Sequence, residues 1–160
     1  MPTWLLGALG ALAAVAVGVA LWARQTGEDT AVEDAARAAQ SAAELAIVPV
    51  LSYDYESLEA DRDRAKSYVT ADYFKDYDQL FGVITDNAPS TQTKVSAEVI
   101  ASGIVRSGED RVDVLVFVDR PTTNKLTPEP VIYKDRVTVS MQKVGEDWLI
   151  DNLVTSPAAQ

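Results

Sequence analysis

Residues 111–120 read RVDVLVFVDR, and the valines at positions 112, 114, 116 and 118 alternate with other residues. Successive side chains of a β-strand point to opposite faces of a sheet, so this alternation predicts a strand with one buried face. The same period recurs at 95–101, at 133–141, where it begins with Tyr133, and at 148–150. The second half of the chain is therefore expected to form about four strands.

The connections between these strands favour antiparallel pairing because most of them are short. The residues SGED at 107–110 fit a tight hairpin, and Gly145–Glu146 fits a two-residue turn. The segment 121–130, PTTNKLTPEP, is longer and contains proline. It predicts a wide loop between the second and third strands.

Three helices are expected before the strands. The first begins at Asp29 or Thr30, carries alanine on its buried stripe and is kinked or ended by Pro49, which lacks a backbone donor. The second is capped by Ser57 and runs through Val69. The run ESLEADRDRAK within it predicts a solvated face, with three ion pairs at three-residue spacing: Glu59–Arg62, Asp61–Arg64 and Asp63–Lys66.

The third helix is expected to be capped by Thr70 and to form the aromatic floor of the core. Its apolar residues follow helical spacing: Tyr73, Tyr77, Leu80, Phe81 and Ile84. The loop signals in TDNAPSTQ, residues 85–92, predict its end. Helices followed by strands indicate an α+β domain, with about three helices on one face of a curved antiparallel sheet.

The first two dozen residues predict a transmembrane helix. Residues 4–22, WLLGALGALAAVAVGVALW, contain no charged side chain. At about 1.5 Å per residue they span roughly 28 Å, close to the hydrocarbon thickness of a bilayer. Trp4 and Trp22 mark the two membrane boundaries and Arg24 lies just beyond. We therefore expect an anchor at 1–24, a connector at 25–29, a folded domain at 30–155 and a tail at 156–160.

A cleaved secretory signal is the competing interpretation, because small residues precede Leu21. No Lys or Arg precedes the apolar run, and the run is longer than the usual signal, so an anchor is favoured. Charge does not decide the orientation. Large C-terminal domains cross largely regardless of charge, and we expect a single-pass protein of the cell membrane with its C-terminal domain outside the cytoplasm.

Small residues line one face of the predicted membrane helix. They are Gly7, Gly10, Ala11, Ala14 and Gly18. In lipid, small side chains let two helix backbones approach closely, so this face is a candidate interface with another membrane helix. The alternative is that Gly and Ala are filler in an alanine-rich segment.

Composition excludes several classes of function. All 14 Lys and Arg and all 24 Asp and Glu lie from Arg24 onward, so the net charge of −10 belongs to the domain and repels nucleic acid. The chain contains no Cys and no His, which removes thiol nucleophiles, Cys/His zinc sites and the usual neutral-pH base. We expect no catalytic residues, no metal and no cofactor. Tyr53, Asp54 and Tyr55 could form a proton shuttle, but sequence neighbours do not point at one spot, and structural roles are favoured.

The segment 50–81, VLSYDYESLEADRDRAKSYVTADYFKDYDQLF, resembles the actinobacterial Mce-associated membrane proteins. Their pattern is a similar SYDY, then a Ser/Thr-capped helix with LxAD, then a T-x-x-F/Y-x-x-x-Y helix. Leu51–Tyr77 matches this pattern, and the order of elements matches along nearly the whole chain. The resemblance implies a nuclear transport factor 2-like domain, similar to the periplasmic domains of type IV secretion scaffolds.

The resemblance also implies a function. It indicates a non-catalytic accessory or assembly subunit of an Mce-type lipid importer, in contact with membrane lipid, a YrbE-type permease and Mce subunits. Two alternatives remain open at this point. One is a lipid-binding module, which a wide apolar cavity would favour, and the other is an isomerase-like enzyme of the same fold, which a polar pocket with a desolvated acid would favour.

Overall fold

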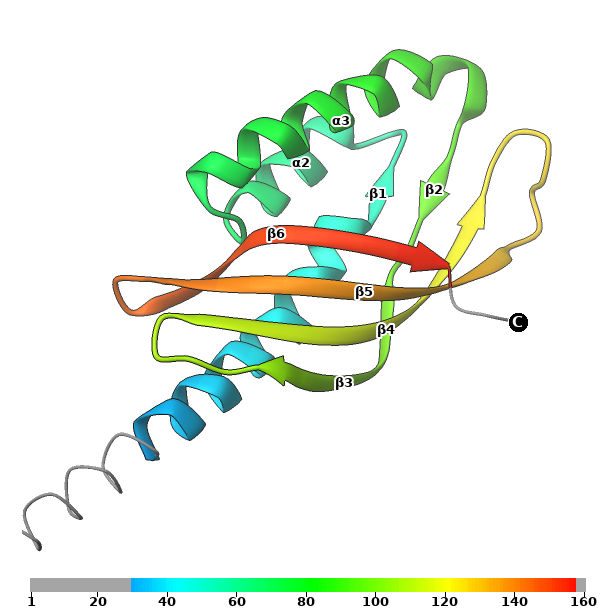
Figure 1. Ribbon diagram of the computed structural model, residues 1–160. Coiled ribbons are helices and arrows are strands. Elements are labelled where there is room, and N and C mark those ends of the chain that lie inside the picture. Colours follow the sequence, from blue (N-terminus) through cyan, green and yellow to red (C-terminus); the bar gives the residue numbers. More distant parts are fainter. Residues whose placement is uncertain (1–29, 158–160) are drawn as a thin grey trace, which may run out of the picture.

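The computed structural model describes residues 30–157 (Figure 1). A helix covers residues 30–51, and two more follow as α2 (Leu58–Lys66) and α3 (Ala71–Thr91). The six strands are β1 (Tyr53–Asp54), β2 (Lys94–Val95), β3 (Glu98–Arg106), β4 (Arg111–Thr123), β5 (Val131–Val144) and β6 (Asp147–Pro157). The expected α+β class is confirmed for the described part of the chain.

All strands belong to one antiparallel sheet with the order β1-β2-β4-β5-β6, and β3 also pairs with β4. The four long strands were predicted, but the first of them, expected at 95–101, is divided, because Val95 belongs to β2 and β3 starts only at Glu98. β1 was not predicted, because two residues are too few to show a period. β6 continues to Pro157, so the sheet includes the first two residues of the expected tail 156–160.

The core lies between the helices and one face of this sheet. The helix 30–51 passes behind the long strands, while α2 and α3 lie beside the β6 edge (Figure 1). The alanine stripe of helix 30–51 is buried against the strands, as the sequence predicted: Ala36, Ala39, Ala43 and Ala46. The sheet contributes the alternating valines of β4: Val112, Val114, Val116 and Val118. Small side chains let this helix lie close to the sheet.

The end of α3 differs from the prediction, because the helix continues through Pro89 to Thr91. Polar side chains near its end bond to backbone carbonyls: Ser90 Oγ donates to Asn87 O at 2.9 Å, and Thr91 Oγ1 to the same oxygen at 3.1 Å. Gln92 then takes a left-handed conformation with φ 50° and closes the helix. The residues that indicated a loop therefore form the last turns of a helix.

The second helix is shorter than predicted and stops at Lys66. Its expected last residues turn toward β6 instead. Ile150 N–H donates to Tyr68 O at 2.9 Å, and Thr70 N–H donates to Ile150 O at 2.9 Å. Thr70 does cap α3, since its side chain accepts a hydrogen bond from the Tyr73 N–H. The segment between the helices thus holds this part of the β6 edge.

Two of the three expected connections are confirmed. β3 and β4 are joined by residues 107–110, and β5 and β6 by Gly145–Glu146, where Gly145 has φ 64°. The third is shorter than expected. β4 continues through Thr123 and β5 starts at Val131, so the wide loop is present but covers residues 124–130 instead of 121–130.

Candidate functional site

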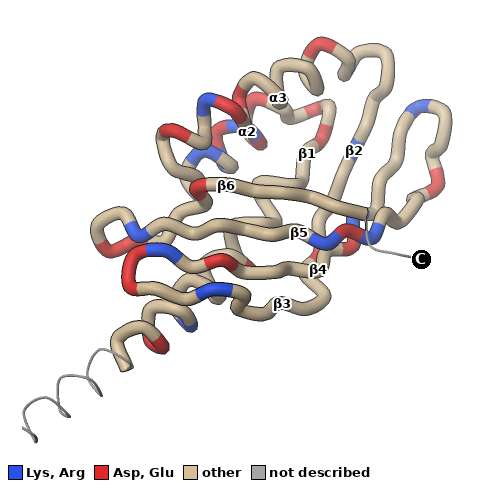
Figure 2. The backbone as a smooth tube through the Cα atoms, in the orientation of Figure 1, with Lys and Arg blue, Asp and Glu red and all other residues tan. Residues whose placement is uncertain are grey.

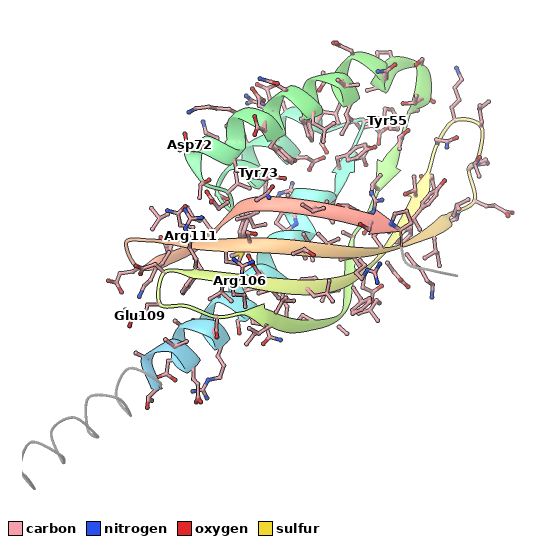
Figure 3. All side chains as sticks on the ribbon, in the orientation of Figure 1. Tyr55, Asp72, Tyr73, Arg106, Glu109 and Arg111 are labelled. Carbon is pink, nitrogen blue, oxygen red and sulfur yellow. The ribbon has the colours of Figure 1, made fainter. Side chains whose placement is uncertain are left out.

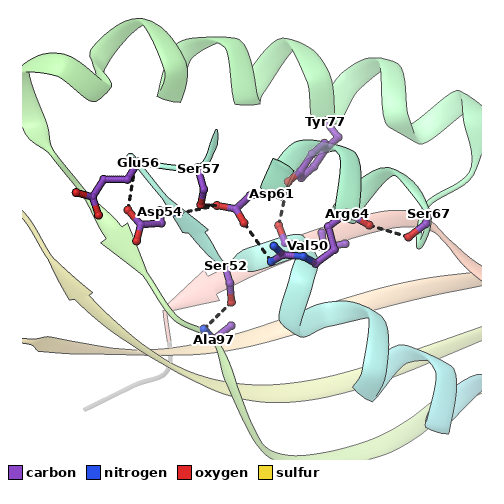
Figure 4. A network of polar contacts seen from close by, with 10 residues as sticks. All are labelled: Val50, Ser52, Asp54, Glu56, Ser57, Asp61, Arg64, Ser67, Tyr77 and Ala97. Carbon is purple, nitrogen blue, oxygen red and sulfur yellow. Dashed lines mark hydrogen bonds and ion pairs between the residues drawn. The ribbon is translucent and has the colours of Figure 1, made fainter. Parts of the chain in front are cut away.

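The segment SYDY, residues 52–55, follows the N-terminal helix directly and contains β1 (Figure 4). Ser52 Oγ accepts a hydrogen bond from the Ala97 N–H at 2.9 Å. The Tyr55 N–H donates to Thr93 O at 3.2 Å. The motif therefore ties the end of a helix to the β2–β3 region, through contacts with residues 38 and 45 positions further along the chain.

Asp61 of α2 is buried beneath this segment, with 5% of its surface exposed. Its Oδ2 accepts hydrogen bonds from the Asp54 N–H at 2.9 Å and from Ser57 Oγ at 3.0 Å, while Oδ1 lies 3.1 Å from Arg64 Nη1 (Figure 4). A buried carboxylate needs such partners to offset its lost hydration. Asp61 thus joins β1 to α2.

These contacts correct the interpretation of the α2 charges. The Asp61–Arg64 pair exists, but Asp61 is not on a solvated face, and Ser57 bonds to it instead of capping the helix with its side chain. Arg62 pairs with Asp78 of α3 and with Asp63, and among the described residues neither Glu59–Arg62 nor Asp63–Lys66 forms an ion pair. The spacing was compatible with both arrangements, because it does not reveal a neighbouring helix.

Lys94 of β2 gathers the acidic residues after the motif. Its Nζ lies 2.5 Å from Glu56 Oε2 and 2.9 Å from Asp54 Oδ2, and 5.2 Å from the centre of the Tyr55 ring. These bonds, to Glu56 first and then to Asp54, raise the pKa of Lys94. Partial burial opposes the shift at Asp54, but the Glu56 N–H and Lys94 together hold the pKa of Asp54 below its ordinary value.

Tyr53, Asp54 and Tyr55 do not converge on one spot. The Tyr53 ring packs edge-on against Phe81, with centroids 6.3 Å apart, whereas Asp54 and Tyr55 contact Lys94. A carboxylate with a lowered pKa is also a weaker base. The arrangement fits the structural interpretation of the three residues.

A cavity of about 300 Å³ lies between α3 and the β6 side of the sheet. Three tyrosines, several aliphatic side chains and one arginine line it: Val50, Leu51, Tyr53, Tyr73, Tyr77, Leu80, Phe81, Ile84, Arg120, Leu153 and Thr155. Tyr73 enters from the start of α3 above β6 (Figure 3). A second cavity of about 220 Å³ shares Tyr53 and Ile84 with it. The two form an aromatic and aliphatic space under α3.

The one charged group at this cavity is already neutralised. Arg120 Nε donates to the carboxylate of Asp135, which is 6% exposed. Breaking a buried pair leaves an uncompensated charge, so a ligand gains little by drawing Arg120 away. The lining favours an apolar, uncharged ligand.

Tyr77, which lines this cavity, should make the stability of the domain depend on pH in the alkaline range. Burial raises the pKa of Tyr77 from 10.0 to about 12. Between these values the folded protein keeps the phenolic proton and the unfolded chain loses it, so the contribution to stability is full below pH 10 and is lost as the pH rises toward 12. We expect a loss of up to about 2 kcal/mol. Tyr77→Phe should reduce this loss when unfolding is measured at pH 8 and pH 11.

At neutral pH the same variant should differ from wild type by about 1 kcal/mol or less, since it loses only a weak bond. The Tyr77 hydroxyl donates to Val50 O at 3.4 Å (Figure 4). The matched control replaces the exposed Tyr133 by Phe. An equal alkaline loss in Tyr77→Phe and wild type would contradict the assignment.

Three polar residues that shape the site were not predicted from the sequence. Asp61 looked like part of a charged surface, and Arg120 and Asp135 were not singled out. A signal was present for the last two. Both continue the alternation of buried residues, Arg120 after Val118 and Asp135 before Val137, and their strands are paired. Opposite charges in the inward register of neighbouring strands indicate a buried pair.

The residues proposed for the membrane segment lie outside the described part of the chain. They are Trp4, Gly7, Gly10, Ala11, Ala14, Gly18, Trp22 and Arg24, and their roles stay predictions. Within residues 30–157, none of the helices combines the length and apolarity needed to cross a bilayer.

Two mycobacterial proteins are similar to the chain in sequence. Protein Rv1362c of Mycobacterium tuberculosis is 35% identical over 117 residues, which cover 72% of this chain and 53% of Rv1362c. Outer membrane protein Rv1973 of the same organism is 31% identical over 128 residues, which cover 77% of this chain and 79% of Rv1973. The chain belongs to the Rv1973 family. It spans about half the length of Rv1362c, and no protein-family model matches it.

Solved structures establish the fold type of this Rv1973 family member. VirB8 of Agrobacterium tumefaciens superposes with a TM-score of 0.59 at 15% identity, covering 75% of this chain and 90% of VirB8. A periplasmic fragment of TraM superposes with a TM-score of 0.63 at 13% identity, covering 76% of this chain and 97% of the fragment. The domain therefore has the VirB8-like form of the nuclear transport factor 2-like fold.

Proposed function

We propose that this chain is a non-catalytic accessory subunit of an Mce-type lipid importer, anchored in the cell membrane with its domain outside the cytoplasm. The main support for the proposal is that the motif residues in segment 52–61 have structural roles. Asp54 and Asp61, the acids of its SYDY and LxAD patterns, are bound to neighbouring elements of the fold. A motif whose residues hold the domain together is consistent with a scaffold protein. The resemblance of Leu51–Tyr77 to the Mce-associated proteins is the basis for the partners that we propose.

The comparisons support a membrane-anchored scaffold in two ways. The relative Rv1973 is named an outer membrane protein. The TraM fragment is periplasmic, and TrwG proteins of similar fold are components of type IV secretion systems. A domain of this kind serves as one part of a larger assembly at a membrane.

Purification of the tagged full chain in mild detergent tests the proposal. We expect a YrbE-type permease and Mce subunits to be identified by mass spectrometry, and the chain itself to stay in membranes after a carbonate wash. A soluble product beginning near Leu21 would establish a cleaved signal. Recovery of neither transporter component would contradict the accessory role.

The small-residue face of the predicted membrane helix provides the matched variants. Gly10→Leu with Gly18→Leu would hold the backbones apart, so the permease should be lost from the purification. Insertion should survive, because Leu is favourable in hydrocarbon. Leu9→Ala with Leu12→Ala, on the opposite face at about 100° per residue, is the control. Unchanged recovery of the permease would mean that the small residues are filler.

A lipid-binding module is the second candidate, and the cavity under α3 favours it. Its volume of about 300 Å³ is at the low end for ligand pockets, and the cavity of about 220 Å³ shares two of its lining residues. The same purification decides this point. A lipid that stays bound to the chain in native mass spectrometry, and is released by Ile84→Trp, would support the module.

A further inference from the structure

The paired strands β4 and β5 extend beyond the rest of the sheet. β6 follows β5 only to the pair Asp135–Pro157, whereas β5 continues to Val131 opposite Thr122 of β4. We call residues 119–134 the arm. It lies at the opposite end of the domain from residue 30, where the chain arrives from the predicted membrane segment (Figure 1). In the described part of the chain, no strand pairs with the outer edge of Val131–Lys134.

The arm exposes large apolar side chains at this edge. Val131 is 43% exposed, Ile132 57%, Tyr133 53%, and Leu126 at the turn 93%. Tyr133 was expected to face the core, because it precedes Val137, Val139 and Met141 in the same alternation. Those three residues are buried whereas Tyr133 is exposed, so the apolar stripe extends beyond the covered part of the sheet.

Hydrogen bonds fix the turn of the arm. Asn124 Oδ1 accepts from the N–H groups of Leu126 at 2.8 Å and Thr127 at 2.9 Å. The Lys125 N–H donates to Thr91 O at 2.9 Å and ties the turn to the end of α3. Leu126 is therefore presented on an ordered loop, which lowers the entropy cost of binding a partner.

The backbone of the arm is turned so that its open edge can bind a strand. Pro121 O accepts from the Ser96 N–H at 3.1 Å, on the side away from β5. In an antiparallel pair, residues directly opposite turn their N–H and C=O groups the same way, toward or away from each other. Ile132, opposite Pro121, thus turns both groups away from β4 and toward the open edge, and so does Lys134 two residues later.

Charge distinguishes the arm from the rest of the domain. The arm carries three basic and two acidic side chains, in a chain whose net charge is −10 (Figure 2). A segment with little net charge meets no net repulsion there. A second copy of the chain would bring another −10, which disfavours self-association. Pro130 and Lys134 flank the exposed residues, as in edges protected against indiscriminate pairing.

We propose that the edge Val131–Lys134, together with Leu126, binds an extended segment of an extracytoplasmic subunit of the transporter as an added β-strand. The segment carries apolar side chains at alternate positions and little net charge. Main-chain bonds to Ile132 and Lys134 hold it, and Tyr133 and Leu126 supply the apolar contacts. The named occupant rests on the proposed function, because that function supplies a subunit on this side of the membrane.

Ile132→Pro tests the strand addition in the full chain. Proline removes the outward N–H and its ring obstructs the edge, yet β4 does not use that N–H, so the domain should still fold. We expect recovery of the extracytoplasmic subunit to fall by about tenfold or more, with the permease and the amount of chain unchanged. Ile132→Val keeps the N–H and should bind normally.

A photoreactive phenylalanine in place of Tyr133 identifies the occupant in intact cells. An adduct with the extracytoplasmic subunit that disappears in Ile132→Pro supports the proposal, and the same probe at Val144, at the other end of β5, should give none. Normal recovery of the subunit by Ile132→Pro, or an adduct with a second copy of this chain, would overturn it. If the wild-type chain recovers neither permease nor subunit, the proposed function fails and the named occupant fails with it.

Discussion

Asp61→Ala should lower the free energy of unfolding by about 2–4 kcal/mol, because it removes a buried acceptor and leaves its donors unpaired. The Asp54 N–H and Ser57 Oγ both donate to this carboxylate, and Arg64 balances its charge. Urea unfolding of residues 25–160 measures the effect. Trp148, which packs against the core and is the only tryptophan of that segment, provides the fluorescence signal.

Two control variants test whether the loss of stability comes from the buried contacts of Asp61. Asp61→Asn keeps one acceptor oxygen and should cost less than Asp61→Ala. Asp63→Ala removes a carboxylate two residues away whose side chain is 66% exposed and lies 3.4 Å from Arg62. It should change stability by about 0.5 kcal/mol or less. Equal effects of Asp61→Ala and Asp63→Ala would mean that the buried contacts contribute little.

The contrast between these aspartates shows why the site was harder to predict than the fold. The strands were predicted because alternation reports which face is buried, and burial is the main determinant of where a strand lies. The charges of α2 follow helical spacing equally well whether solvent or β1 lies opposite them. Spacing within one helix cannot say what packs against it, so Asp61 looked like its exposed neighbours.

The ends of helices and strands were also hard to predict from the sequence. Pro89 and its polar neighbours indicated a loop, yet the same Ser and Thr hydroxyls bond to helix carbonyls and complete α3. Such residues satisfy the backbone in either state, and long-range contacts choose between them. The arm arises in the same way. Its proline-bearing sequence suggested a wide loop from residue 121 onward, and the pairing with β5 extends β4 past Pro121, so that the loop begins later.

Ala43→Leu should displace the N-terminal helix from the sheet. Ala43 is 0% exposed, and a leucine there has no space to occupy without moving the helix or the valines beneath it. Overpacking of this kind costs about 1–3 kcal/mol. Ala38→Leu makes the same change on the exposed side of the helix and should leave stability within about 0.5 kcal/mol of wild type.

The consequence of Ala43→Leu should reach function as well as stability. The helix 30–51 follows directly after the predicted membrane segment and the connector 25–29, so it is the element through which the sheet is held relative to the membrane. We expect the full-chain Ala43→Leu variant to retain the permease, whose contact is assigned to the membrane helix, and to lose the extracytoplasmic subunit, whose contact is assigned to the arm. Recovery of both by a variant that is measurably destabilised would show that the position of this helix on the sheet is not required for assembly.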